Sequence, residues 1–214
     1  MKTILLLPVF FLTLSAFAQN KAIEMTHYIF PEFVQATVKM HSGGKNTPML
    51  NYNSLTEEMI FETNGKKLAM DKLSEIDTIY IEGRIFIPYQ KKFIELIHHN
   101  IYELYAVHKC SLIDPGKPAA YGGTSQTSSS TSFSSFSSGG QLYELSLPDG
   151  YGTKPYTEYI LVKDGKYNSF LTIKQLSKLF EDQAALFKEY TKSHKVKYEN
   201  QESIVALISF LEQQ

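Results

Sequence analysis

Six histidines are the residues of this chain best suited to bind a metal ion or to carry a proton near neutral pH: His27, His41, His98, His99, His108 and His194. Their spacing argues against a shared site, because it includes no His-x-His or His-x-x-x-His pair and no companion cysteines. His98 and His99 are expected at a hairpin tip, with His108 roughly 3.3 Å further away per residue along the returning strand. We therefore predict no metal and no other cofactor, and we expect all six histidines at the surface or in turns.

Motifs for nucleophilic or acid–base catalysis are missing from the sequence. A serine nucleophile needs a tight strand-to-helix turn or a lysine base, and no Gly-x-Ser-x-Gly or Ser-x-x-Lys segment occurs in that context. The acid pairs Glu57-Glu58 and Glu181-Asp182 point apart on a strand or lie at a helix start. We predict no catalytic residues. A hydrolase acting on envelope or dietary polymers is the alternative, because active sites assembled from distant residues leave no local motif.

Tyrosines give the chain more material for binding than for catalysis. It contains 14 tyrosines and no tryptophan. A sheet face that carries tyrosines can stack on sugars or peptides, although packing in the core is the competing interpretation. The tyrosines in or beside predicted strands are Tyr52, Tyr80, Tyr89, Tyr102, Tyr105, Tyr143, Tyr156, Tyr159 and Tyr167. The sequence thus favours a noncatalytic protein that binds an unknown ligand or protein partner.

Two other binding modes stay open at this point. The first is an apolar ligand held between a curled sheet and the terminal helices, since the open end of a curled sheet is a common ligand site. An assembly subunit that joins through exposed strand edges is the other. The formal net charge of -1, with acidic and basic residues interspersed, predicts no nucleic-acid partner. The oligomeric state is not predicted.

Cys110 is the only cysteine, so the chain cannot form an internal disulfide. It lies in residues 105–112, which are typical of a strand. Free cysteine is among the most buried residue types, so we expect an unreactive buried thiol and a fold stabilised by packing alone.

The elements that must position these residues are mostly short strands. Residues 19–121 form a β-rich region, and residues 141–171 add a hairpin region to the same body. Asn64-Gly65 and Asp164-Gly165 are strong hairpin signals, and Glu82-Gly83 suits a tight turn. The pattern predicts an α+β fold, whose antiparallel, sheet-rich body is a meander or a curled half-barrel.

Helical periodicity begins near the C-terminal end, in residues 172–214. Thr172 can cap a first helix, a second is expected from Glu181 to Ser193, and Asn200 starts a third. Two or three short helices are therefore predicted.

Residues 122–140 contain little besides serine, threonine and glycine. Such a composition buries too little apolar surface to offset the entropy of ordering, which predicts a flexible loop. Phe133 and Phe136 interrupt it. They are candidates for contacts with the sheet or with a ligand.

Residues 1–18 have the three parts of a secretory signal peptide: Lys2, an apolar run too short to span a bilayer, and Ala16 and Ala18 before the cut. The mature chain is predicted to begin at Gln19 without an integral membrane segment. No cysteine lies near Ala18, so the lipoprotein route is not expected. The protein is predicted to be exported, to the periplasm first and to the extracellular space or outer surface as alternatives.

Several segments form a pattern over nearly the whole mature chain: 50–53, 58–61, 84–88, 155–157 and the most specific one, the run Pro-Gly-Lys-Pro-Ala-Ala-Tyr-Gly-Gly-Thr-Ser-Gln-Thr at 115–127. With it the chain resembles a group of secreted proteins of Bacteroidetes bacteria that has no assigned activity, cofactor or catalytic residue. The resemblance implies a Gram-negative envelope location and nothing about chemistry. Asp77-Thr78-Ile79 resembles the acceptor motif of general protein O-glycosylation in these bacteria, which implies Thr78 as a modification site.

Overall fold

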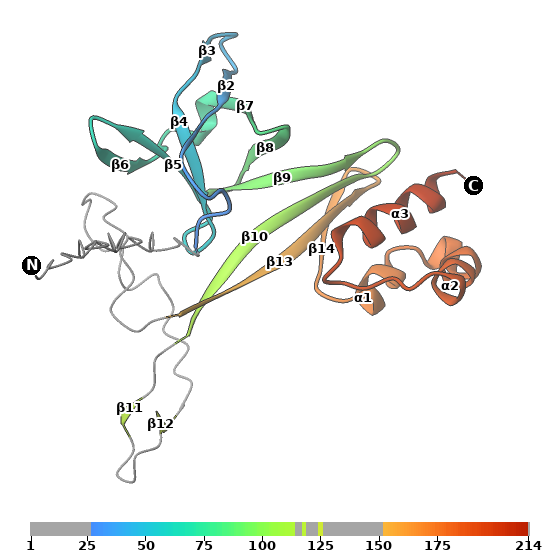
Figure 1. Cartoon of the computed structure of the whole chain (residues 1–214). Coiled ribbons are helices and arrows are strands. Elements are labelled where there is room, and N and C mark those ends of the chain that lie inside the picture. The colour runs from blue at the N-terminus through green and yellow to red at the C-terminus, as the bar shows by residue number, and fades with distance from the viewer. Residues whose placement is uncertain (1–26, 114–116, 119–123, 126–151, 214) are drawn as a thin grey trace, which may run out of the picture.

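The computed structural model describes residues 27–113, 117–118, 124–125 and 152–213 (Figure 1). Within these residues the fold is α+β, as the sequence predicts, with antiparallel sheets followed by short helices. The predicted signal peptide 1–18 lies outside the described residues, as do Phe133 and Phe136. Of the predicted loop 122–140, only Thr124 and Ser125 are described.

The strands belong to two open sheets and one short pair. The larger sheet has, from edge to edge, β14 (Lys166–Phe170), β13 (Gly152–Lys163), β10 (Glu103–Ile113), β9 (Lys92–His99), β8 (Arg84–Tyr89), β7 (Ile76–Ile81), β2 (Thr37–Met40) and β3 (Lys45–Asn46). The smaller sheet has β1 (Val34–Gln35), β4 (Met49–Asn53), β5 (Glu58–Thr63) and β6 (Lys66–Ala69). The short pair is β11 (Lys117–Pro118) with β12 (Thr124–Ser125).

The predicted tight turns form where their sequences favour them. Asn64 and Gly65 have φ angles of 51° and 71°, and Asp164 and Gly165 have 54° and 69°. Two consecutive residues with positive φ are what a two-residue hairpin between twisted strands requires. The turn between β9 and β10 is wider than expected, because residues 100–102 all lie outside the strands.

Helices follow the last strand with the expected caps. They are α1 (Ile173–Lys178), the 3-10 turn η3 (Glu181–Gln183), α2 (Ala184–Ser193) and α3 (Gln201–Glu212); a further 3-10 turn, η1 (Leu73–Glu75), precedes β7. Thr172 Oγ1 accepts a hydrogen bond from the Gln175 amide at 3.1 Å, and Asn200 Oδ1 accepts one from the Ser203 amide at 2.9 Å. Both caps satisfy amides that the helix itself leaves without acceptors. No helix among the described residues is long and apolar enough to cross a bilayer.

One face of the larger sheet is covered by different layers at its two ends (Figure 1). The helices pack on the β14, β13 and β10 end, where the core residues from the sheet are Leu104, Ala106, Tyr159, Leu161 and Phe170. The smaller sheet packs on the β8, β7 and β2 end, where the two sheets together bury Val38, Leu50, Tyr52, Met59, Ile79, Ile81, Phe86 and Phe93. The body is thus two cores side by side on one sheet.

The opposite face of the larger sheet is curled. Tyr89 on β8 and Tyr167 on β14 are separated by four strand-to-strand steps, which span about 19 Å in a flat sheet. Their ring centroids lie only 5.1 Å apart, so the sheet curls toward the face that carries these two side chains. The hollow side of the bend is filled by Ile94, Tyr105, Val107 and Ile160.

Candidate functional site

Three stacked tyrosines lie on the hollow side of the curled sheet. We call Tyr89, Tyr105 and Tyr167 the tyrosine stack. The Tyr167 ring lies 5.1 Å from the Tyr89 ring and 6.3 Å from the Tyr105 ring, with interplanar angles of 26° and 24°. Tyr105 is buried, whereas Tyr167 is 48% exposed. Tyr105 is therefore the buried member of the stack, and Tyr167, which contacts both other rings, is partly accessible to solvent.

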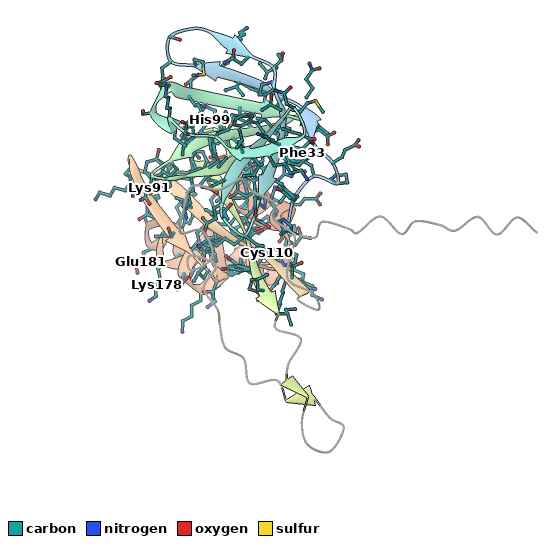
Figure 2. The ribbon with its side chains drawn as sticks, turned by 90° about the vertical axis from the view of Figure 1, so that its left-hand side faces the viewer. Phe33, Lys91, His99, Cys110, Lys178 and Glu181 are labelled. Carbon is teal, nitrogen blue, oxygen red and sulfur yellow. The ribbon has the colours of Figure 1, made fainter. Side chains whose placement is uncertain are left out.

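Strand register explains why these rings share one face. Tyr105 lies opposite Ile160, and Tyr167 lies opposite Val162, two residues further along the same strand. Side chains two residues apart on a strand project to the same face. Tyr89 reaches the stack from the last residue of β8, just before the turn to β9 that Lys91 marks in Figure 2.

Glu103 is a polar residue of this face that contacts the stack directly. The Tyr105 hydroxyl donates to Glu103 Oε2 at 2.8 Å, and His99 Nδ1 lies 3.2 Å from Glu103 Oε1. Burial, followed by this contact with the carboxylate, raises the pKa of Tyr105. The hydroxyl consequently stays protonated and keeps the Glu103 carboxylate beside the stack.

A chain of ion pairs occupies the region where the smaller sheet meets β9, β10 and β13. Glu57, in the turn between β4 and β5, lies 2.7 Å from Lys92 Nζ and 3.5 Å from Lys109 Nζ, and Lys109 Nζ lies 2.9 Å from Glu158 Oε2. Burial would lower the pKa of Lys109, but the hydrogen bond to Glu158 and the charge of Glu57 raise it overall. These contacts attach the smaller sheet to the larger one.

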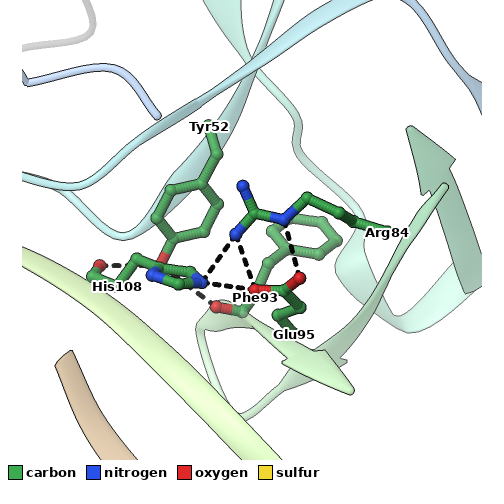
Figure 3. Close-up of polar contacts among 5 residues, drawn as sticks. All are labelled: Tyr52, Arg84, Phe93, Glu95 and His108. Atoms are coloured by element: carbon green, nitrogen blue, oxygen red, sulfur yellow. Dashed lines mark hydrogen bonds and ion pairs between the residues drawn. The ribbon is translucent and has the colours of Figure 1, made fainter. Parts of the chain in front are cut away.

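A second polar cluster lies on the packed face, between β8, β9 and β10 (Figure 3). Arg84 donates to Glu95 through Nε and Nη2, both at 2.6 Å, and His108 Nε2 lies 2.5 Å from Glu95 Oε2. The Arg84 guanidinium also lies 5.2 Å above the Phe30 ring and 5.3 Å above the Phe86 ring. Because an ionised carboxylate only accepts, we assign the ring proton of His108 to Nε2, toward Glu95.

The Arg84–Glu95–His108 cluster keeps its carboxylate charged. Burial alone would raise the pKa of Glu95, but the hydrogen bonds from Arg84 and His108 outweigh it and hold that pKa below its usual range. Tyr52 reaches the same region from the smaller sheet, with its hydroxyl 3.2 Å from the Phe93 and His108 carbonyl oxygens. Tyr52 therefore links the two sheets beside the cluster, and the cluster itself orients an imidazole against a carboxylate.

Cys110 is two residues after His108 on β10 and projects to the same packed face of the larger sheet (Figure 2). Its thiol is buried, as the sequence predicts. Burial raises the pKa of Cys110, which keeps the thiol protonated at neutral pH. The arrangement does not activate a cysteine nucleophile.

Glu212 forms a third cluster, in the last turn of α3. Its carboxylate is fully buried and accepts hydrogen bonds from His98 Nε2 at 2.8 Å, from the Tyr102 amide at 2.7 Å and from Asn100 Nδ2 at 3.2 Å. An acid near a helix C-terminus opposes the helix dipole, so specific donors must stabilise it. Here those donors come from His98 on β9 and from the turn between β9 and β10.

The expectation that all six histidines lie at the surface or in turns is wrong for two of them. His27 is buried but lies in a turn, whereas His98 and His108 lie on strands with side chains only 13% and 15% exposed. These two are largely covered because carboxylates from other segments accept their ring protons. Glu95 carries a signal for this in the sequence, since it is a charged residue within the apolar run from Phe93 to Ile97.

The remaining predicted residues are dispersed. Tyr52 and Tyr159 are core residues, Tyr80 and Tyr156 are exposed, and Tyr143 lies outside the described residues. Thr78 is half-buried on β7 opposite Lys39, and its glycosylation stays a prediction. Within the described ranges, no group of three or more His, Cys, Asp or Glu side chains is arranged to hold a metal ion.

Comparisons of the chain with protein-family models, with curated proteins and with solved structures find no match. The argument for function therefore depends on the geometry of these clusters.

Proposed function

We propose that this chain is an exported, noncatalytic protein of the cell envelope that binds a ligand at the tyrosine stack. The observation that carries the proposal is the 48% exposure of Tyr167 on a stack whose inner ring, Tyr105, is buried. The signal-like residues 1–18 and the resemblance to secreted Bacteroidetes proteins support export, with the periplasm as the leading location.

The stack has the physical properties of a binding surface. Tyrosine offers a large apolar contact area and a polar hydroxyl, and it loses little conformational entropy on binding. Contacts with Tyr89 and Tyr105 hold the Tyr167 ring before a ligand arrives. Such preorganisation lowers the cost of association.

A binding screen with matched tyrosine variants tests this proposal. Arrays of glycans and of peptides, probed with purified mature protein, should give a signal that Tyr167→Ala removes. Tyr80→Ala is the control, because Tyr80 is a 37% exposed tyrosine on β7, away from the stack. Signals that survive Tyr167→Ala, or that Tyr80→Ala removes equally, would contradict the proposal.

A hydrolase is the second candidate, because Glu95 and His108 form a carboxylate–imidazole pair that could orient a general base. Arg84 neutralises that carboxylate and links the pair into the sheet, which favours a structural role. Assays with p-nitrophenyl glycosides and esters would support the hydrolase if wild-type protein turned one over and His108→Ala did not.

A further inference from the structure

β14 is an edge strand of the larger sheet, and its register shows which of its backbone groups point away from that sheet. Within the described residues it pairs with β13 alone. The two-residue turn between these strands directs the backbone groups of Lys163 and Lys166 toward each other. Because this direction alternates along an antiparallel strand, Tyr167 and Ser169 point their amides and carbonyls outward.

The other outer edges of the two sheets have protection that β14 lacks. β1 and β3 are only two residues long, and β6 carries Lys66 and Lys67. Short strands and lysines are common devices against edge-to-edge pairing. β14 has five residues, and its single lysine, Lys166, lies next to the turn. Among the described edges, β14 is therefore the one best suited to accept another strand.

The outward residues make this edge complementary to itself. Two copies can pair antiparallel around a two-fold axis at Asn168, which places Tyr167 of one copy opposite the partner's Ser169. Residues paired in this way exchange both of their backbone hydrogen bonds. The symmetry gives the second copy the same contacts, so the outward amides and carbonyls of both edges find partners.

The side chains on the hollow face fit the same register. Tyr167 is 48% exposed, Leu171 directly after β14 is 51% exposed, and Ser169 between them is small. The partner's Tyr167 and the partner's Leu171 lie diagonal to Tyr167, at about 7–8 Å, which is within reach of an aromatic side chain. Pairing of two copies therefore covers the large apolar residues that this edge exposes.

We infer that β14 is a dimerisation edge, on which two copies of this chain pair antiparallel across Asn168 to form one continuous sheet. The inference goes beyond the proposed function, because self-association needs no ligand. In the dimer the partner's Tyr167 lies next to the tyrosine stack, so the two stacks form one surface.

The charge and size of this interface predict its strength. The formal net charge of -1 causes little repulsion between copies. Lys166 lies opposite the partner's Phe170, about 13 Å along the strand from the partner's Lys166. An edge of five residues covers less than the about 800 Å² per partner of a standard interface. The dimer is therefore weak, with a Kd of about 10–100 µM.

Sedimentation velocity of the mature protein at about 1 to 500 µM tests the inference. The wild type should change from monomer to dimer over this range. Ser169→Pro should raise the Kd at least about tenfold, because proline removes an outward amide while the hydrogen bonds to β13 remain. Ser169→Ala is the matched control, since it keeps that amide and should dimerise like the wild type. The melting temperature of each variant establishes that it is folded.

Disulfide cross-linking tests the register and does not depend on the proline variant. Asn168 lies opposite the partner's Asn168 in a pair without hydrogen bonds, where Cα atoms are about 4.5 Å apart and a disulfide can form. Asn168→Cys should therefore give a covalent dimer with oxidised glutathione. Lys166→Cys is the control and should not, because its partner lies about 13 Å away. Cys110 is buried and adds no cross-link.

Two results would overturn the inference. Wild-type protein that stays monomeric at about 500 µM would leave the edge free for a strand of a different protein. A dimer that cross-links equally through Asn168→Cys and Lys166→Cys would have its contact elsewhere. Neither measurement involves a ligand, so failure of the proposed binding function would leave both unchanged.

Discussion

Glu212 on α3 and His98 at the end of β9 are 114 residues apart in the chain, yet their side chains are joined by a 2.8 Å hydrogen bond. With the Asn100 and Tyr102 donors, this contact attaches the C-terminal helix to the turn between β9 and β10. It places a charge at the edge of an otherwise apolar core.

Replacement of Glu212 by alanine should destabilise the fold by about 3 kcal/mol, because three hydrogen bonds to one buried carboxylate are lost together. Chemical denaturation followed by circular dichroism measures the change. Glu202→Ala is the matched control, since Glu202 is an exposed acid in the first turn of the same helix and should cost less than about 1 kcal/mol. Equal effects of the two variants would argue against a stabilising role for the hydrogen bonds to Glu212.

Glu95 should make the stability of the protein depend on pH in the acid range. Its pKa is lower in the folded state than the ordinary value of 4.5. Its stabilising contribution is therefore fully present above about pH 5 and is lost as the pH falls through the folded-state pKa. The difference in unfolding free energy between wild type and Glu95→Gln should shrink as the pH falls below about 5. A difference that grows on acidification would contradict the ion-pair account.

Tyr167 should contribute modestly to stability in addition to its proposed role in binding. Tyr167→Ala removes the contacts with Tyr89 and Tyr105 and should cost about 2 kcal/mol, as expected for two aromatic pairs. Tyr167→Phe keeps the ring and should stay within about 0.5 kcal/mol of wild type. A loss above about 4 kcal/mol in Tyr167→Ala would identify the ring as an essential core residue instead.

Deletion of residues 122–140 should leave the melting temperature nearly unchanged if that segment is a spacer. A fall of about 5 °C or more would indicate that it packs on the body. The double variant Phe133→Ser, Phe136→Ser distinguishes the two phenylalanines from the rest of the segment. It should reproduce such a fall if the rings make the contacts.

Export can be tested on the mature protein directly. Intact mass and N-terminal sequencing of the protein recovered from a periplasmic fraction should give Gln19 as the first residue. Retention of Lys2 in that product would exclude the predicted cleavage.

Local features of the fold were predictable from the sequence, whereas contacts between distant segments were not. Asp164-Gly165 and the caps Thr172 and Asn200 depend on neighbouring residues alone, so their structures follow from their sequences. The separation of β4, β5 and β6 into a second sheet depends instead on what each strand packs against.

The candidate site was predictable only by residue type. A tyrosine-bearing face was expected, but the choice of Tyr89, Tyr105 and Tyr167 follows from the curl of the sheet, which no local pattern encodes. The histidines illustrate the same limit. In isolation His98 and His108 have the pattern of turn and strand residues. Their low exposure follows only from Glu212 and Glu95, which the fold brings next to them.

The hydrogen bond between His98 and Glu212 also bears on the rate of folding. Contacts between residues far apart in sequence require long loops to close before they contribute, so folding slows as their share rises. This fold joins such distant segments in one eight-stranded sheet, and the hydrogen bond between His98 and Glu212 also attaches α3 to β9. We therefore expect it to refold in about milliseconds to seconds. The helices at that end should be the last part of the body to become protected from hydrogen exchange.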